Sequence, residues 1–174
     1  TDTGEKILRW DLDSGQLIDE LAGHTGAIHH LTYSHRGEKL ASASEDRQIK
    51  IWDVSSGREL YRVLGHTEAV FTTTFSPNDK QIASGTLGGK IQVWRANKNR
   101  GNLQINREDP TRIHQVTFSP DGTSLAAAGD DHTISLWDSF TGELQQTLHG
   151  HTQAVSSIAY LSDGKQLVSG SLDN

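Results

Sequence analysis

Residues 23–53 read GHTGAIHHLTYSHRGEKLASASEDRQIKIWD. Three short runs within this stretch, AIHHLTY, KLASASE and QIKIWD, are separated by the segment SHRG and by an Asp-Arg pair. Short runs bounded by such turn residues are typical of antiparallel β-strands joined by tight hairpins. The stretch also contains His24, several serines and Asp46, which are the ingredients of a hydrolytic triad. These polar residues either perform catalysis or hold the strands together.

The same pattern recurs along the chain. Its tryptophans are Trp10, Trp52, Trp94 and Trp137, with consecutive spacings of 42, 42 and 43 residues, and Gly-His pairs at 23–24, 65–66 and 150–151 follow the same period. Repetition at this period indicates one supersecondary unit per repeat. Each unit has room for four short strands, and no segment shows a helical period, so the sequence predicts an all-β fold.

Composition limits the classes of function. The chain has 174 residues, of which 33% are hydrophobic, and a formal net charge of −6. The negative charge disfavours a nucleic-acid surface, which needs clustered Lys and Arg, and no apolar run is long enough for a membrane helix. The chain contains no cysteine, which excludes disulfides and thiolate catalysis. A cytoplasmic protein without nucleic-acid or membrane partners is expected.

The period, the Gly-His pairs, the RWD, IWD and LWD triplets and the Asp-bearing turn resemble the WD-repeat β-propeller family over essentially the whole chain. The linkers of the form D-x-x-[ST]-G look most similar to those of bacterial members. The resemblance implies four-stranded antiparallel blades, with strands a to d running outward from a central channel. It divides the chain into a partial blade at 1–22 (strands c and d), blades at 23–64, 65–107 and 108–149, and a partial blade at 150–174 (strands a and b).

These pieces amount to about four blades, whereas members of the family commonly have about seven. The chain is therefore expected to be part of a larger ring. The ring would close through the missing blades of a parent chain or through a second copy, unless the two half-blades of one chain pair to close a small four-bladed ring.

The resemblance also implies a role for the apparent triad. A loop His, a strand-b Ser, a turn Asp and a strand-c Trp form a hydrogen-bonded structural tetrad, which here is His24, Ser42, Asp46 and Trp52, with Ser44 as the alternative hydroxyl. A shared network satisfies all of these buried polar groups. No G-x-S-x-G nucleophile motif occurs, and an active site is seldom repeated within one domain, so no catalytic residue is assigned. The remaining tetrad positions are His66, Ser84 and Trp94; Asp131 and Trp137; and His151, Ser169 and Asp173.

Two repeats depart from the tetrad pattern. Gly88 stands where the turn Asp of the second complete repeat is expected, while Asp109 and Ala127 replace the His and Ser of the third. These blades are expected to be held less tightly. The indole of Trp137 should then need another acceptor.

The family binds proteins and peptides mostly through the face that carries the d–a loops and the b–c turns. Phe71 and Leu87 would form an apolar patch there, unless Phe71 packs sideways into a neighbouring loop. Adjacent strand residues point to opposite faces, so His29 and His30 cannot share a metal ion, and no metal or cofactor is expected. The predicted partner-binding residues are His29, Glu45, Phe71, Leu87, Arg112, His114, Asp130 and Ser156.

A basic stretch runs through an otherwise acidic chain. It is either solvated charge on an outer strand or a contact for an acidic partner. Its members are Arg95, Lys98, Arg100, Arg107 and Arg112.

The sequence favours a non-enzymatic scaffold that binds a protein or peptide, as the sensor or interaction part of a larger protein. One alternative is a propeller enzyme, a hydrolase or dehydrogenase with its site at the channel mouth. Another is a purely architectural spacer. The predicted mouth is mostly Ala, His, Phe and Ser, which suits contact more than chemistry.

Overall fold

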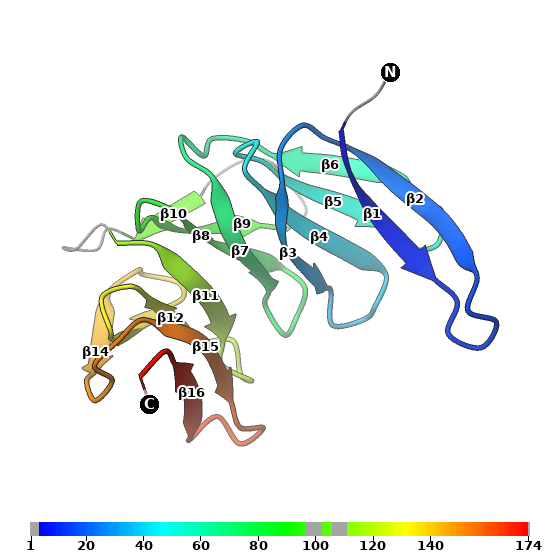
Figure 1. The fold of residues 1–174 in the computed structure, drawn as a ribbon. Helices are drawn as coiled ribbons and strands as arrows, with labels where there is room; N and C mark the ends of the chain where they lie inside the picture. Colours follow the sequence, from blue (N-terminus) through cyan, green and yellow to red (C-terminus); the bar gives the residue numbers. More distant parts are fainter. Residues whose placement is uncertain (1–3, 97–101, 106–110, 174) are drawn as a thin grey trace.

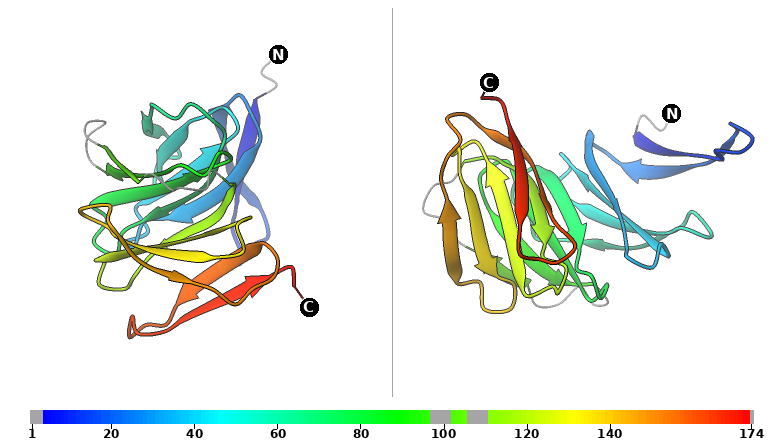
Figure 2. Two further views of the ribbon diagram at one scale, coloured as in Figure 1. Left: turned by 90° about the vertical axis from the view of Figure 1, so that its left-hand side faces the viewer. Right: turned by 90° about the horizontal axis from the view of Figure 1, so that it is seen from below.

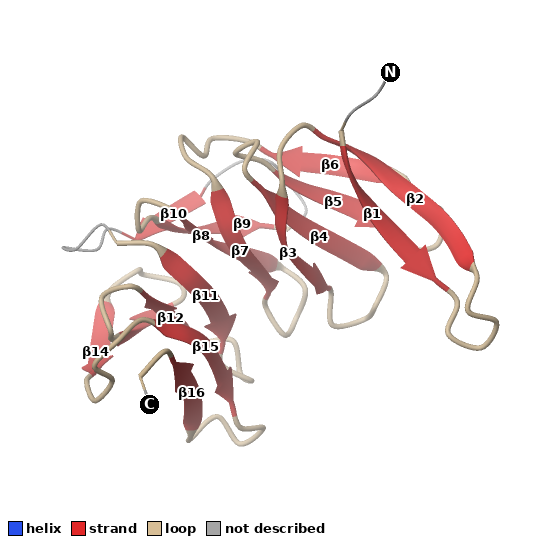
Figure 3. Ribbon diagram, viewed as in Figure 1, coloured by secondary structure: helices blue, strands red, loops and turns tan. Residues whose placement is uncertain are grey.

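A computed structural model describes residues 4–96, 102–105 and 111–173. The described residues form sixteen strands and no helix, which confirms the all-β prediction (Figure 3). Asp109, Lys98, Arg100 and Arg107 lie outside the described residues.

The strands form five antiparallel sheets in chain order. β1 (Glu5–Trp10) and β2 (Leu17–His24) make the first, two-stranded sheet. Three four-stranded sheets follow, and β15 (Val155–Tyr160) with β16 (Leu167–Ser171) makes the last, two-stranded one. The four-stranded sheets consist of β3 (Ile28–Tyr33), β4 (Lys39–Ser44), β5 (Ile49–Asp53) and β6 (Glu59–Val63); β7 (Val70–Phe75), β8 (Gln81–Thr86), β9 (Ile91–Arg95) and β10 (Asn102–Ile105); and β11 (Ile113–Phe118), β12 (Ser124–Gly129), β13 (Ile134–Asp138) and β14 (Leu144–Leu148).

The sheets are arranged as an open fan (Figure 1). Strands β3, β7, β11 and β15 line its inner side, and β6, β10 and β14 lie at its outer side, as the two rotated views in Figure 2 also show. This is the arrangement of propeller blades around an axis.

Apolar side chains fill the space between neighbouring sheets. The second strand of each four-stranded sheet is almost completely buried, because other sheets press on both of its faces. Each of three indoles packs against the preceding sheet: Trp52 against β1–β2, Trp94 against β3–β6 and Trp137 against β7–β10. Trp10 differs, since no described sheet precedes its own, and it is 55% exposed.

Hydrogen bonds also link the inner strands of neighbouring sheets. The main-chain N–H of Ile158 donates to Gln115 Oε1 at 2.8 Å, and that of Val116 donates to Thr72 Oγ1 at 3.4 Å. The side chain of His30 also bonds to the main chain of Thr73 on the next inner strand, and this bond favours the protonated imidazole although burial lowers its pKa overall. One side chain per repeat therefore holds the next inner strand through its backbone.

Candidate functional site

The complete tetrad joins the end of β2 to β4 and β5. The indole N–H of Trp52 donates to Ser42 Oγ at 2.9 Å, Ser42 Oγ lies 2.7 Å from His24 Nε2, and His24 Nδ1 lies 2.6 Å from Asp46 Oδ2. Ser44 does not belong to this chain of bonds, because its hydroxyl donates to the carbonyl of Gly26 at 2.8 Å.

The pKa shifts of His24 and Asp46 indicate which tetrad atoms carry a proton. Burial lowers the pKa of His24, so the imidazole is neutral at pH 7. Burial opposes ionisation of Asp46, but bonds from His24 and from the main chain of Thr25 and Gln48 outweigh it and lower the pKa of the carboxyl. A neutral ring that donates from Nδ1 to Asp46 accepts at Nε2 from the hydroxyl of Ser42. Every donor in the row then has one acceptor.

This row matches the order of groups in a hydrolytic triad, but it does not offer a nucleophile. Ser42 is fully buried, with 0% of its surface exposed, and the indole of Trp52 occupies its oxygen. A catalytic serine must reach a substrate carbonyl beside an oxyanion hole. The arrangement therefore serves to fix the loop before β3 against β4 and β5.

The other repeats make parts of the tetrad. His66 Nε2 and the indole of Trp94 contact Ser84 Oγ at 2.9 and 3.4 Å, while His66 Nδ1 is buried without a partner among the described residues. His151 contacts Ser169 and Asp173 at 2.8 and 3.0 Å. Ser169 is exposed, since no described strand covers the outer edge of β16.

The third complete repeat lacks the central bonds. Ala127 offers no hydroxyl, and the buried indole N–H of Trp137 has no acceptor among the described residues. Asp131 instead accepts from the hydroxyl of Thr133 at 2.9 Å within its own turn.

Glu68 fills the place that Gly88 leaves open, which sequence reasoning missed. Its Oε2 accepts from the main-chain N–H of Gly88 at 2.8 Å and from the hydroxyl of Thr86 at 3.2 Å. A Cβ at residue 88 would collide with this carboxylate. One signal could have revealed this contact. The turn of this repeat lacks its Asp, and the loop before β7 in the same repeat carries an acidic residue, Glu68.

Burial of His66 makes the stability of the fold depend on pH. Burial lowers the pKa of His66 to about 4, whereas an unfolded histidine titrates near about 6.5. Between these values the unfolded chain binds the extra proton, so stability falls with decreasing pH and its loss levels off below about pH 4. The loss from this residue is about 3 kcal/mol. We expect His66→Asn to be less acid-sensitive in urea titrations at a series of pH values; an unchanged pH dependence would contradict the assignment.

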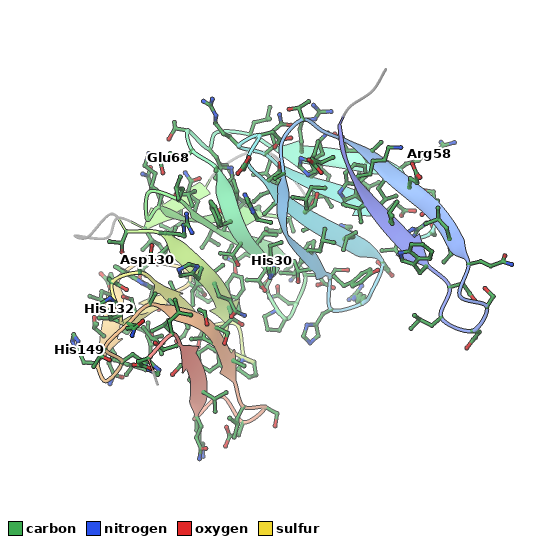
Figure 4. All side chains as sticks on the ribbon, viewed as in Figure 1. His30, Arg58, Glu68, Asp130, His132 and His149 are labelled. Atoms are coloured by element: carbon green, nitrogen blue, oxygen red, sulfur yellow. The ribbon has the colours of Figure 1, made fainter. Side chains whose placement is uncertain are left out.

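The predicted partner-binding residues meet at one end of the fan. We call this end, formed by the beginnings of β3, β7, β11 and β15 with the β4–β5, β8–β9 and β12–β13 turns, the loop face. Figure 4 shows Glu68 and Asp130 on this side. Leu87 is 43% exposed here. Ser156 is also exposed, and its hydroxyl donates to the carbonyl of Gly170.

Three side chains from successive sheets form what we call the mouth stack. The imidazole of His29 lies parallel to the ring of Phe71, with 4.1 Å between centroids and 12° between planes. The guanidinium carbon of Arg112 lies 4.6 Å from the centroid of the same ring. Phe71 is half-buried between neighbours, so the apolar patch expected from Phe71 and Leu87 carries an imidazole and a guanidinium as well.

Two carboxylates at the loop face are paired with imidazoles. His114 Nε2 lies 2.6 Å from Asp130 Oδ1, and His29 Nε2 lies 3.4 Å from Glu45 Oε1. No described residue accepts a hydrogen bond from the guanidinium of Arg112 or forms an ion pair with it, and its Nε is buried without a partner.

A hollow of about 540 Å³ lies toward the other end of the inner strands. Threonines, prolines and aromatic rings line it, and its described lining includes the imidazole of His35 but no carboxylate. No group of three or more potential metal ligands occurs among the described residues. No described helix is long and apolar enough to span a membrane.

Comparison with known proteins gives consistent matches. A sequence profile of the family described as "WD domain, G-beta repeat" matches residues 15–53, 57–95, 103–138 and 142–174. The chain is 47% identical over 55 residues to "Lissencephaly-1 homolog" of Caenorhabditis briggsae, covering 32% of this chain and 14% of that protein. It is 41% identical over 61 residues to "Nuclear distribution protein nudF" of Aspergillus flavus (35% and 13%) and to "Intraflagellar transport protein 122 homolog" of Mus musculus (35% and 5%). The matched segments are thus a small part of each of these relatives.

Proposed function

Since the chain belongs to the WD-repeat family, we propose that it is a non-enzymatic scaffold that binds a protein or peptide partner on its loop face. The observation that carries the proposal is the mouth stack, in which His29, Phe71 and Arg112 from three successive sheets meet. Aromatic and arginine side chains held in place by their neighbours are typical of residues that dominate binding energy. The buried tetrad fixes the loop before β3, the strand that carries His29, which supports a rigid binding surface.

The burial of Ser42 and the lack of a carboxylate in the described lining of the inner hollow favour this function over a propeller enzyme. The spacer alternative differs in predicting no partner at the loop face. We further propose that the chain is the interaction part of a larger cytoplasmic protein. Its blades would be 23–64, 65–107 and 108–149, with half-blades at 1–22 and 150–174. Missing blades or a second copy would close the ring.

The proposal predicts that Phe71→Ala weakens partner binding. The probe is a set of dodecapeptides, selected from a random displayed library on the immobilised chain and measured by calorimetry. Removal of a central aromatic contact should weaken binding about tenfold or more. The matched control is Phe140→Ala, because Phe140 is 64% exposed and lies in the β13–β14 turn. Failure to recover a saturable peptide, or equal binding by Phe71→Ala and the unmodified chain, would contradict the proposal.

A further inference from the structure

The guanidinium of Arg112 is a positive charge on the loop face without an acceptor among the described residues. Its Nε is buried and unpartnered, and a buried donor without an acceptor costs stability. Its contact in the structure is the ring of Phe71, 4.6 Å away, which holds the flat group in place but accepts no conventional hydrogen bond from it.

No described carboxylate forms an ion pair with this guanidinium, and three carboxylates at the loop face contact other groups. Asp130 is paired with His114 and Glu45 with His29. Glu68 accepts from the main chain of Gly88 and lies 3.5 Å from the ammonium of Lys90. Within residues 4–96, 102–105 and 111–173, the guanidinium is therefore available for an acceptor that comes from a bound partner.

We propose that Arg112 recognises a carboxylate side chain, Asp or Glu, of a peptide bound on the loop face. This inference rests on the proposed function and names the chemistry of its partner. A guanidinium presents parallel N–H donors that fit the two oxygens of a carboxylate. Because contact with the ring of Phe71 already restricts the Arg112 side chain, little side-chain freedom is lost on binding.

The surroundings favour a single negative charge over a double one. The half-exposed carboxylates of Glu45 and Asp130 border the mouth stack, and the chain carries a net charge of −6. A phosphate dianion would meet stronger repulsion from these groups than a carboxylate would. The partner is thus an acidic peptide with one anchoring Asp or Glu near an apolar residue.

A double-mutant cycle on the selected dodecapeptides tests the assignment. In each peptide every Asp and Glu is changed in turn to its amide, and both forms are titrated against the unmodified chain and Arg112→Gln. One amide change should weaken binding to the unmodified chain about tenfold or more, as expected for a hydrogen bond between charged groups. That change should have little effect on binding to Arg112→Gln.

The controls separate this contact from general charge and from folding. Arg36→Gln removes an exposed arginine beyond the far end of β3 and should leave the preference for the acidic peptide intact. Arg112→Lys keeps the charge without the planar fork and should recover only part of the preference. Melting curves for both Arg112 variants establish that they are folded.

Two results would overturn the inference. In the first, peptides lose affinity for Phe71→Ala, but their amide changes have the same effect on the unmodified chain and on Arg112→Gln. The guanidinium would then only cover the ring, while the proposed function would stand. If a peptide with phosphoserine in place of the anchoring Asp or Glu binds more tightly than the original peptide, Arg112 recognises phosphate instead of carboxylate. Failure of every peptide to bind is a different result, which would reject the proposed function itself.

Discussion

Trp52→Ala is expected to lower the free energy of unfolding by about 4 kcal/mol, the range found for large buried aromatic residues. The indole is 2% exposed and packs with Ile7, Leu21 and Leu40. Its removal creates a cavity and also takes away the donor to Ser42. In a chain of this size the melting temperature should fall by roughly 8–16 °C.

Trp137 is the internal comparison, because it occupies the equivalent position and is 6% exposed. Its indole N–H has no acceptor among the described residues. Trp137→Ala therefore loses packing but no hydrogen bond, and it also removes an unsatisfied buried donor. We expect a loss smaller by about 1–2 kcal/mol. Thermal melts of Trp52→Phe and Trp137→Phe sharpen the contrast, since phenylalanine keeps much of the volume. Equal losses at the two positions would show that the tetrad bonds contribute nothing measurable.

Glu59→Gln is expected to destabilise the fold by about 2–3 kcal/mol, because it leaves the ammonium of Lys50 without its counter-ion. Lys50 is 2% exposed and its Nζ lies 2.6 Å from Glu59 Oε2 and 5.7 Å from the ring centroid of Trp52. This expected loss of stability is smaller than is usual for a fully buried ion pair. The Glu59 side chain is 23% exposed, so water can partly solvate the ion pair.

The next repeat supplies the control for this pair. Gln92 stands at the position equivalent to Lys50, opposite Ser84 on the neighbouring strand, and is also buried. Lys50→Gln combined with Glu59→Gln should therefore recover most of the stability that Glu59→Gln loses, as measured by urea unfolding. A double variant as unstable as the single one would show that the carboxylate acts through a group other than Lys50.

The repeat period was enough to predict the class of the fold and its strand pattern. Turn residues and alternating runs indicate hairpins locally, and recurrence at one spacing indicates equivalent sheets. Repetition says less about each individual copy. Trp10 shares the period but is exposed, because the burial of an indole depends on the sheet that precedes its own.

The details of the candidate site needed the structure. Glu68, from a different loop, occupies the space beside Gly88 where the turn Asp is missing, but His66 Nδ1 still has no partner among the described residues. This compensation does not follow the repeat. The contact of Phe71 with His29 and Arg112 joins residues more than forty positions apart. Such contacts depend on how neighbouring sheets are placed, which the periodicity within one sheet does not specify.

The links between inner strands bear on how such an array can change by duplication. In two of them, Thr72 and Gln115 accept from peptide N–H groups of the next sheet, and every residue except proline offers such a group. The tetrad residues, in contrast, come from a single stretch, residues 24–52. A repeat copied or moved as a unit would carry its matched side chains with it and require only a peptide backbone from its new neighbour.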